Sequence, residues 1–109
     1  MINITIYQNH AGQYTGLSCI GHAGFEGFGK DIVCAAVSVL VLNTLNAVEA
    51  FTDEVFAFES DQKSGLIDIH FQKPVGHDAG LLFDTMVLGL KEIQNQYGTD
   101  YILLTFKEV

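Results

Sequence analysis

The chain contains no arginine and only five lysines, against thirteen acidic residues, so its formal net charge at pH 7 is −8. A protein that binds nucleic acid needs cationic side chains to displace the counterions around the phosphates. This composition therefore disfavours direct nucleic-acid binding. The negative charge is typical of a soluble protein, and it would also steer a basic partner toward the surface.

Proline and cysteine are scarce as well. One proline and 49% hydrophobic residues indicate a globular chain rather than a disordered or fibrous one, and the length predicts a single domain over residues 1–109. Cys19 and Cys34 can form at most one disulfide. Residues 1–6 alternate as a strand does and lack the pattern of a signal peptide, so we expect a cytoplasmic protein with reduced thiols.

Hydrophobic periodicity predicts the fold. Ile2, Ile4 and Ile6 alternate with polar residues, which indicates a strand with one buried face. The other expected elements, in chain order, are strand 14–20, helix 31–51, strands 55–58 and 66–71, helix 78–97 and strand 101–106. The order ββαββαβ predicts an α+β fold in which two helices pack on a mostly antiparallel sheet.

The first helix, 31–51, is unusually apolar. Its C-terminal half has a polar stripe, but its N-terminal half has almost no polar residue except Ser38. A helix with apolar residues on every side must be shielded from water on every side, and a single sheet shields only one of them. We therefore expect another subunit or the preceding loop to cover the rest, and a homodimer is predicted. The apolar run 32–42 is too short to span a bilayer, so no membrane association is expected.

Residues 21–34 concentrate the groups that carry chemistry. Asp31 is a preferred N-cap residue, which would place Cys34 at about the third helical position. Free backbone N–H groups and the helix macrodipole stabilise a thiolate there. His22 follows the predicted strand, and the loop after it is long enough to fold the imidazole back over the helix start. The sequence thus predicts a reactive thiol with a nearby base.

Two neighbouring residues have alternative roles. Asp31 either caps the helix, which its local position favours, or orients the imidazole. Ser38 either hydrogen-bonds near the Cys34 thiolate or donates to the Cys34 carbonyl, as serines in helices often do. The Cys34 N–H and a neighbouring loop N–H are candidates for an oxyanion hole. Cys19 shares a strand face with Leu17, so we expect it to be a buried, inert thiol.

The loop between strand and helix combines glycines with two aromatic residues. Gly24, Phe25, Gly27, Phe28 and Gly29 form either a flap that orders over a bound peptide or a loop whose phenylalanines pack into the core. A phosphate-binding loop is disfavoured because the Walker spacing is absent.

Two blocks together, Gly21-His22-Ala23-Gly24 and Gly29-Lys30-Asp31-Ile32-Val33-Cys34-Ala35-Ala36-Val37-Ser38, resemble the ribosomal-processing cysteine protease family. These small bacterial enzymes trim an N-terminal extension from a large-subunit ribosomal protein. The resemblance extends to chain length and element order. It implies that Cys34 is the nucleophile, that His22 is the base and that the partner is a ribosomal protein precursor, with no cofactor. It gives no third catalytic residue.

Three other kinds of protein are compatible with parts of this sequence. A metal site at Cys19, His22 and Cys34 matches no common zinc spacing and has no evident fourth ligand, so no metal is expected. A non-catalytic interaction module, in which Cys34 is inert, and a redox-sensing thiol protein remain as alternatives. His70 lies on the polar side of its predicted strand, where we expect it to be exposed.

Overall fold

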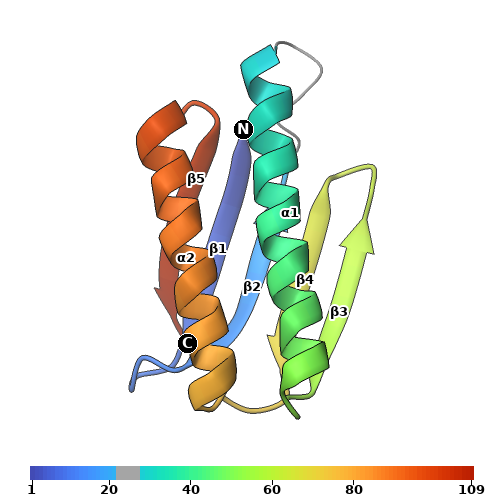
Figure 1. Ribbon diagram of the computed structural model, residues 1–109, viewed down its shortest axis with the longest axis vertical. Coiled ribbons are helices and arrows are strands. Elements are labelled where there is room, and N and C mark those ends of the chain that lie inside the picture. Colours follow the sequence, from blue (N-terminus) through green and yellow to red (C-terminus); the bar gives the residue numbers. More distant parts are fainter. Residues whose placement is uncertain (22–27) are drawn as a thin grey trace.

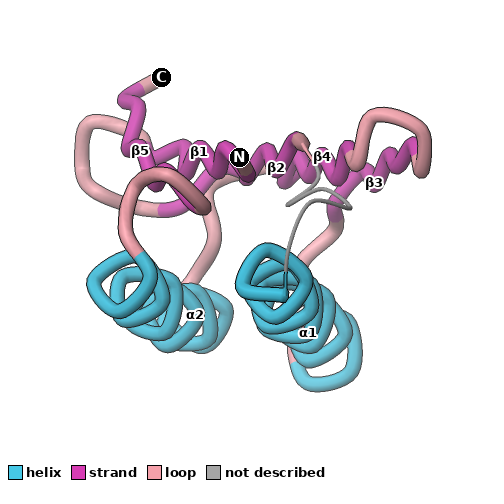
Figure 2. Tube along the Cα trace, turned by 90° about the horizontal axis from the view of Figure 1, so that it is seen from above, coloured by secondary structure: helices cyan, strands magenta, loops and turns pink. Residues whose placement is uncertain are grey.

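The structure is a computed structural model that describes residues 1–21 and 28–109, with side chains described for 1–21 and 32–109. It has two layers, because both helices lie side by side on one face of a five-stranded sheet (Figure 1, Figure 2). The elements, in chain order, are β1 (Ile2–Gln8), β2 (Tyr14–Ile20), α1 (Phe28–Phe51), β3 (Phe56–Asp61), β4 (Leu66–Phe71), α2 (His77–Tyr97) and β5 (Ile102–Glu108). The predicted α+β class and the order ββαββαβ are confirmed.

The sheet order is β3-β4-β2-β1-β5. β1 runs parallel to β5, whereas the pairs β1/β2, β2/β4 and β3/β4 are antiparallel. The hairpin between β1 and β2 turns at Asn9, whose side-chain oxygen accepts hydrogen bonds from the Ala11 N–H at 3.0 Å and the Gln13 N–H at 2.9 Å. Gly12 follows with a φ of +83°, a conformation that glycine adopts without a steric penalty. The hairpin therefore fixes the register of the two central strands.

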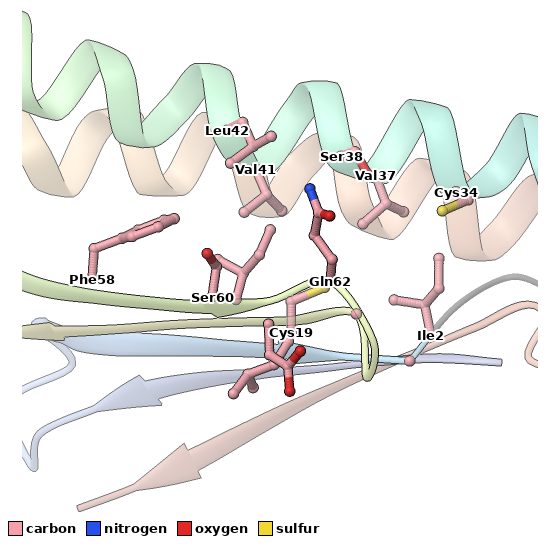
Figure 3. Close-up of a pocket in the computed structure, with 15 residues that line it drawn as sticks. Ile2, Cys19, Cys34, Val37, Ser38, Val41, Leu42, Phe58, Ser60 and Gln62 are labelled. Atoms are coloured by element: carbon pink, nitrogen blue, oxygen red, sulfur yellow. The ribbon is translucent and has the colours of Figure 1, made fainter.

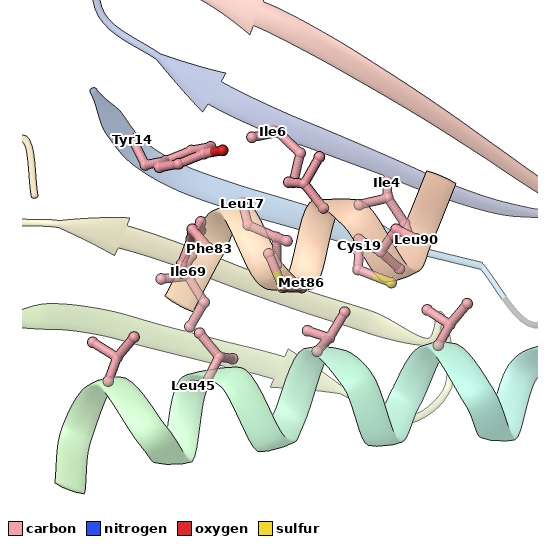
Figure 4. Close-up of a cluster of buried hydrophobic side chains, with 14 of the residues drawn as sticks. Ile4, Ile6, Tyr14, Leu17, Cys19, Leu45, Ile69, Phe83, Met86 and Leu90 are labelled. Carbon is pink, nitrogen blue, oxygen red and sulfur yellow. The ribbon is translucent and has the colours of Figure 1, made fainter. Parts of the chain in front are cut away.

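The core lies between the sheet and the helices (Figure 4). Strand residues that share the inward face meet apolar residues of both helices, as the period-two and helical patterns predict. The largest fully buried side chains are Phe83, Ile2, Ile4, Ile6, Leu17, Ile69, Met86, Leu90, Ile102, Val33, Val37 and Val41.

α2 forms close to the predicted range 78–97 and buries one apolar stripe. Ala79, Phe83, Met86 and Leu90 are buried, and the helix ends at Gly98, whose N–H bonds to the Gln94 carbonyl at a φ of +93°. Glycine is common at such a C-terminal position because it adopts a positive φ without a steric penalty. The stripe places α2 over the β1/β5 side of the sheet (Figure 2).

α1 begins earlier than predicted. The chain is already helical at Phe28, so Asp31 is not the N-cap, and Cys34 is the seventh rather than about the third residue of α1. The glycines around Phe28 favour a loop on local propensity alone, but the helix continues through Gly29 nonetheless. The prediction that Asp31 caps the helix is therefore wrong.

One side of α1 is buried along most of its length. The stripe consists of Val33, Val37, Val41, Leu45 and Val48. By length and composition alone, Ile32–Phe51 is apolar enough to cross a membrane, although the expected apolar run was judged too short for this. In the fold, the stripe packs on the sheet as the core face of a globular helix does.

The strand at the far side of α1 is less covered than the others. α1 lies beneath β2 and β4, and β3 extends beyond it (Figure 2). β3 is also shifted from its predicted position and runs to Asp61. Its last residues are polar and exposed, which is common in an edge strand, so the apolar pattern that marks a buried strand is missing there.

A glycine in the centre of the sheet allows a test of this packing. A Cβ atom on Gly16 would overlap the carbonyl oxygen of Ile69 in the neighbouring strand. We predict that Gly16→Ala lowers the free energy of unfolding by about 1–3 kcal/mol, measured by urea denaturation. Gly80→Ala in α2 is the matched control, because a Cβ there meets nothing within 4 Å, and it should raise stability by about 0.5–1 kcal/mol. Equal urea midpoints for the two variants would contradict this packing.

Candidate active site

Cys34 opens onto a cavity of about 520 Å³ between α1 and the β3–β4 hairpin (Figure 3). The α1 wall is formed by Cys34, Val37, Ser38, Val41 and Leu42, and the floor includes Cys19 of β2. Cys34 is half-buried, so its sulfur is neither sealed in the core nor fully in solvent. A cysteine at such a position can meet a ligand in the cavity.

The stripe that α1 buries determines which side chains face this cavity. Residues three or four positions apart lie on one face of a helix. Burying Val33 and Val37 against the sheet therefore turns the next row, Cys34 and Ser38, toward the β3–β4 hairpin. Ser38 lines the same cavity one turn beyond Cys34, and its two alternative hydrogen-bonding roles stay predictions.

The earlier start of α1 changes the electrostatics expected at Cys34. Only the first few N–H groups of a helix lack an intrahelical acceptor. As the seventh helical residue, Cys34 has its N–H in the helix interior, where that group bonds to the carbonyl four residues earlier. The expected role of this N–H in an oxyanion hole is therefore wrong.

Several predicted site residues cannot be placed. His22, Gly24, Phe25 and Gly27 lie outside the described residues, so neither the distance from the imidazole to Cys34 nor the flap is tested. Phe28, Gly29 and Asp31 belong to α1, but their side chains are not described. The orientation of the imidazole by Asp31 therefore stays a prediction.

The residue before this segment is well defined. Gly21 has a φ of +106°, and a Cβ there would crowd the carbonyl of Met1, so the position favours glycine on two grounds. The Gly21 N–H also donates to the Ser64 carbonyl, at 3.1 Å, in the turn between β3 and β4. The chain therefore leaves β2 toward His22 from a position attached to the hairpin that forms one wall of the cavity.

That hairpin wall was not identified from the sequence. It contributes Phe58, Ser60, Asp61, Gln62 and Ile67. The sequence predicts the two strands of this hairpin, 55–58 and 66–71, but nothing in it indicates that the hairpin faces α1. Only the sheet order, which places β4 beside β2, brings these residues opposite Cys34.

Cys19 is buried as predicted, with 5% of its surface exposed. Burial raises the pKa of the Cys19 thiol to about 11, and the neighbouring Cys34 adds to the shift. Cys19 therefore stays protonated at neutral pH, and the two cysteines of the cavity differ in environment.

The other candidate ligands lie elsewhere. His70 is exposed on the sheet face away from the helices, as predicted, and its Nε2 lies 3.1 Å from Asp68. Within residues 1–21 and 28–109, no group of three or more histidine, cysteine or acidic side chains is arranged to hold a metal ion.

Comparison with known proteins decides the class of this site. The family model of the cysteine protease Prp matches residues 1–102. This chain belongs to the Prp family of cysteine proteases. The ribosomal processing cysteine protease Prp of Staphylococcus aureus is 31% identical over 107 residues, which cover 98% of this chain and 100% of that protein. The Prp of Bacillus subtilis is 28% identical over 101 residues, 89% of this chain and 90% of its own.

Solved structures of Prp agree with the fold. The S. aureus protease in complex with a covalently linked product peptide superposes with a TM-score of 0.88 at 31% identity. The same protease with a substrate peptide gives a TM-score of 0.89 at 30% identity. Each comparison covers 98% of this chain and 100% of the solved chain. The predicted resemblance and the predicted class of enzyme, a cysteine protease, are confirmed.

The different environments of the two thiols predict selective alkylation. At pH 7.5, iodoacetamide should modify Cys34 at least about tenfold faster than Cys19, because Cys19 is buried and only thiolates react. Peptide mapping by mass spectrometry after timed quenching measures both rates. Cys34→Ser should leave the native protein nearly unreactive, with Cys19 labelled only after urea is added. Labelling of both cysteines at equal rates in the native protein would contradict the burial described here.

Proposed function

We propose that this protein removes a short N-terminal extension from a large-subunit ribosomal protein, with Cys34 as nucleophile and His22 as general base. The proposal rests on one observation above all: the family's cysteine position opens onto a cavity that can admit a peptide. The S. aureus relative is a ribosomal processing protease and has been solved with a substrate peptide, which supports the same substrate class here.

The proposed reaction is acyl transfer. The imidazole of His22 accepts the thiol proton, and the Cys34 sulfur attacks the scissile carbonyl carbon. The peptide C–N bond then breaks, the imidazolium donates its proton to the leaving amine, and the acyl group remains on sulfur as a thioester. Water hydrolyses the thioester and restores the thiol. A covalently linked product peptide in the S. aureus relative fits this covalent route.

Two further residues have proposed supporting roles. Ser38 lies on the cavity wall one turn from Cys34, from where its hydroxyl can hydrogen-bond to a peptide or to the thiolate. Asp31 would orient the imidazole of His22, since capping of the helix no longer explains it. Gly24, Phe25, Gly27, Phe28 and Gly29 are proposed to cover the bound substrate.

The proposed setting is the cytoplasm, and the proposed assembly is a homodimer. The outer side of α1 keeps apolar side chains in solvent, among them Val39, which is 68% exposed, and Phe51, which is 77% exposed. Exposed apolar side chains along one helix are commonly covered by a second subunit. The acidic net charge suits a basic substrate such as a ribosomal protein, and no nucleic-acid contact is proposed.

A cleavage assay with paired histidine variants tests the catalytic assignment. The precursor of the ribosomal protein should be cut by the unmodified enzyme, and Cys34→Ala and His22→Ala should each lower kcat/KM by at least about 10³-fold, because each removes half of the nucleophile–base pair. His70→Ala is the matched control, since His70 is exposed on the opposite face of the sheet, and it should cut normally. Full activity of His22→Ala would overturn the assignment of the base.

Light scattering tests the proposed dimer. We expect a mass of about twice 11.9 kDa over the micromolar range, because the apolar side of α1 is otherwise left in water. A mass equal to one chain over that whole range would contradict the dimer while leaving the catalytic proposal intact.

A further inference from the structure

The cavity continues well beyond Cys34. It follows α1 for two turns, from Cys34 to Leu42, with the β3–β4 hairpin as its other wall (Figure 3). Eight residues of α-helix advance by about 12 Å. An extended peptide advances by about 3.3 Å per residue, so this part of the cavity holds three to four residues of a substrate.

The end of the cavity remote from Cys34 is apolar. Leu42 from α1 and Phe58 from β3 lie on opposite walls there (Figure 3). Phe58 pairs in register with Ile69, which is buried, so both side chains point to the helix side of the sheet. Phe58 is nevertheless 51% exposed and Leu42 is 40% exposed, because β3 extends past α1 and nothing in the described chain fills the space between them.

The middle of the cavity is more polar. Ser38 on α1 and Ser60 on β3 lie between Cys34 and the apolar end. An extended peptide has backbone N–H and C=O groups that need hydrogen-bond partners when they leave water, and two hydroxyls can each donate or accept. The polar middle of the cavity suits the backbone of an extended peptide, and the apolar end suits one of its apolar side chains.

We propose that Leu42 and Phe58 form a specificity pocket for a large aliphatic or aromatic side chain of the substrate, three or four residues from the scissile bond. This inference rests on the proposed cleavage of a peptide at Cys34. The occupant is a substrate rather than a second subunit, because the apolar end is continuous with the cavity that holds the nucleophile. Structures of the S. aureus relative with substrate and product peptides favour the same occupant.

The pocket would contribute to discrimination between substrates. A hydrophobic pocket distinguishes side chains by about tenfold or more when carbon atoms are removed from the side chain that fills it. Replacement of the apolar substrate residue by alanine should therefore lower kcat/KM by at least about tenfold. Replacement of a residue that lies outside the cavity should change it less than about threefold.

A mixture of random dodecapeptides tests the pocket without assuming the natural substrate. The mixture is incubated with the full chain, and the cleaved bonds are identified by mass spectrometry. With the unmodified enzyme, we expect Leu, Ile, Met or Phe to be enriched at the third or fourth residue on one side of the cleaved bond. Leu42→Gln and Phe58→Ser should each remove that enrichment while the enzyme still cleaves.

Two matched controls separate this effect from general damage. Leu88→Gln changes a leucine of α2 that is 64% exposed, and Phe106→Ser changes a phenylalanine of the opposite edge strand that is 43% exposed. Both lie outside the cavity, so both should keep the enrichment. Urea midpoints of all four variants show whether each is folded at the assay temperature.

The outcomes are distinct. Cleavage without enrichment, or enrichment that survives in Leu42→Gln and Phe58→Ser, would overturn the pocket and leave the protease intact. Dissociation of a dimer by these variants with unchanged peptide preference would assign the same residues to a subunit interface and also overturn it. No cleavage by the unmodified enzyme, of either the mixture or the ribosomal precursor, would overturn the proposed function and the pocket together.

Discussion

Burial of the valine stripe on α1 is the constraint on which the rest of the structure depends. Val33, Val37 and Val41 recur every four residues, and their burial against the sheet fixes the rotation of the helix about its own axis. That rotation leaves Cys34 on the flank of the helix rather than in the core. It also turns the same flank toward the β3–β4 hairpin, so a single packing interaction positions both the thiol and one wall of the cavity.

The two cysteines that line the cavity differ in burial. Cys19 and Cys34 line one cavity, but Cys19 belongs to the core and remains protonated, whereas Cys34 stands at its edge. Because α1 begins at Phe28, the helix terminus is too far from Cys34 to supply free N–H groups. The helix dipole therefore explains less of the proposed reactivity of Cys34 than its sequence position predicts, and the proposed base, His22, becomes the more important partner.

The sequence predicted the elements well because each has a clear period. The alternation of Ile2, Ile4 and Ile6 and the stripe of α2 both reflect a single buried face, which local pattern reports directly. The start of α1 was missed because Gly29 and its neighbours have the composition of a loop, and packing of the following turns overrides that propensity.

The sequence predicts the proposed catalytic residues but not the cavity wall opposite them. Cys34 and His22 are close in the chain, so a motif can reveal them. Phe58 and Leu42 are sixteen residues apart in the chain, and they line one cavity only because the sheet order places β3 at the edge on the side of α1. No local sequence pattern reports this arrangement. The apolar wall of the cavity is therefore a property of the topology.

The mismatch in width between the two layers explains why a chain of this size has room for a substrate at all. Five strands at a spacing of about 4.8 Å make a sheet about 24 Å wide, and two helices with their side chains cover about 20 Å. In the part of the chain that the structure describes, the margin falls at β3, where no helix lies over the inner surface of the sheet (Figure 2). A third helix would cover that margin, and the proposed substrate peptide takes its place beside α1.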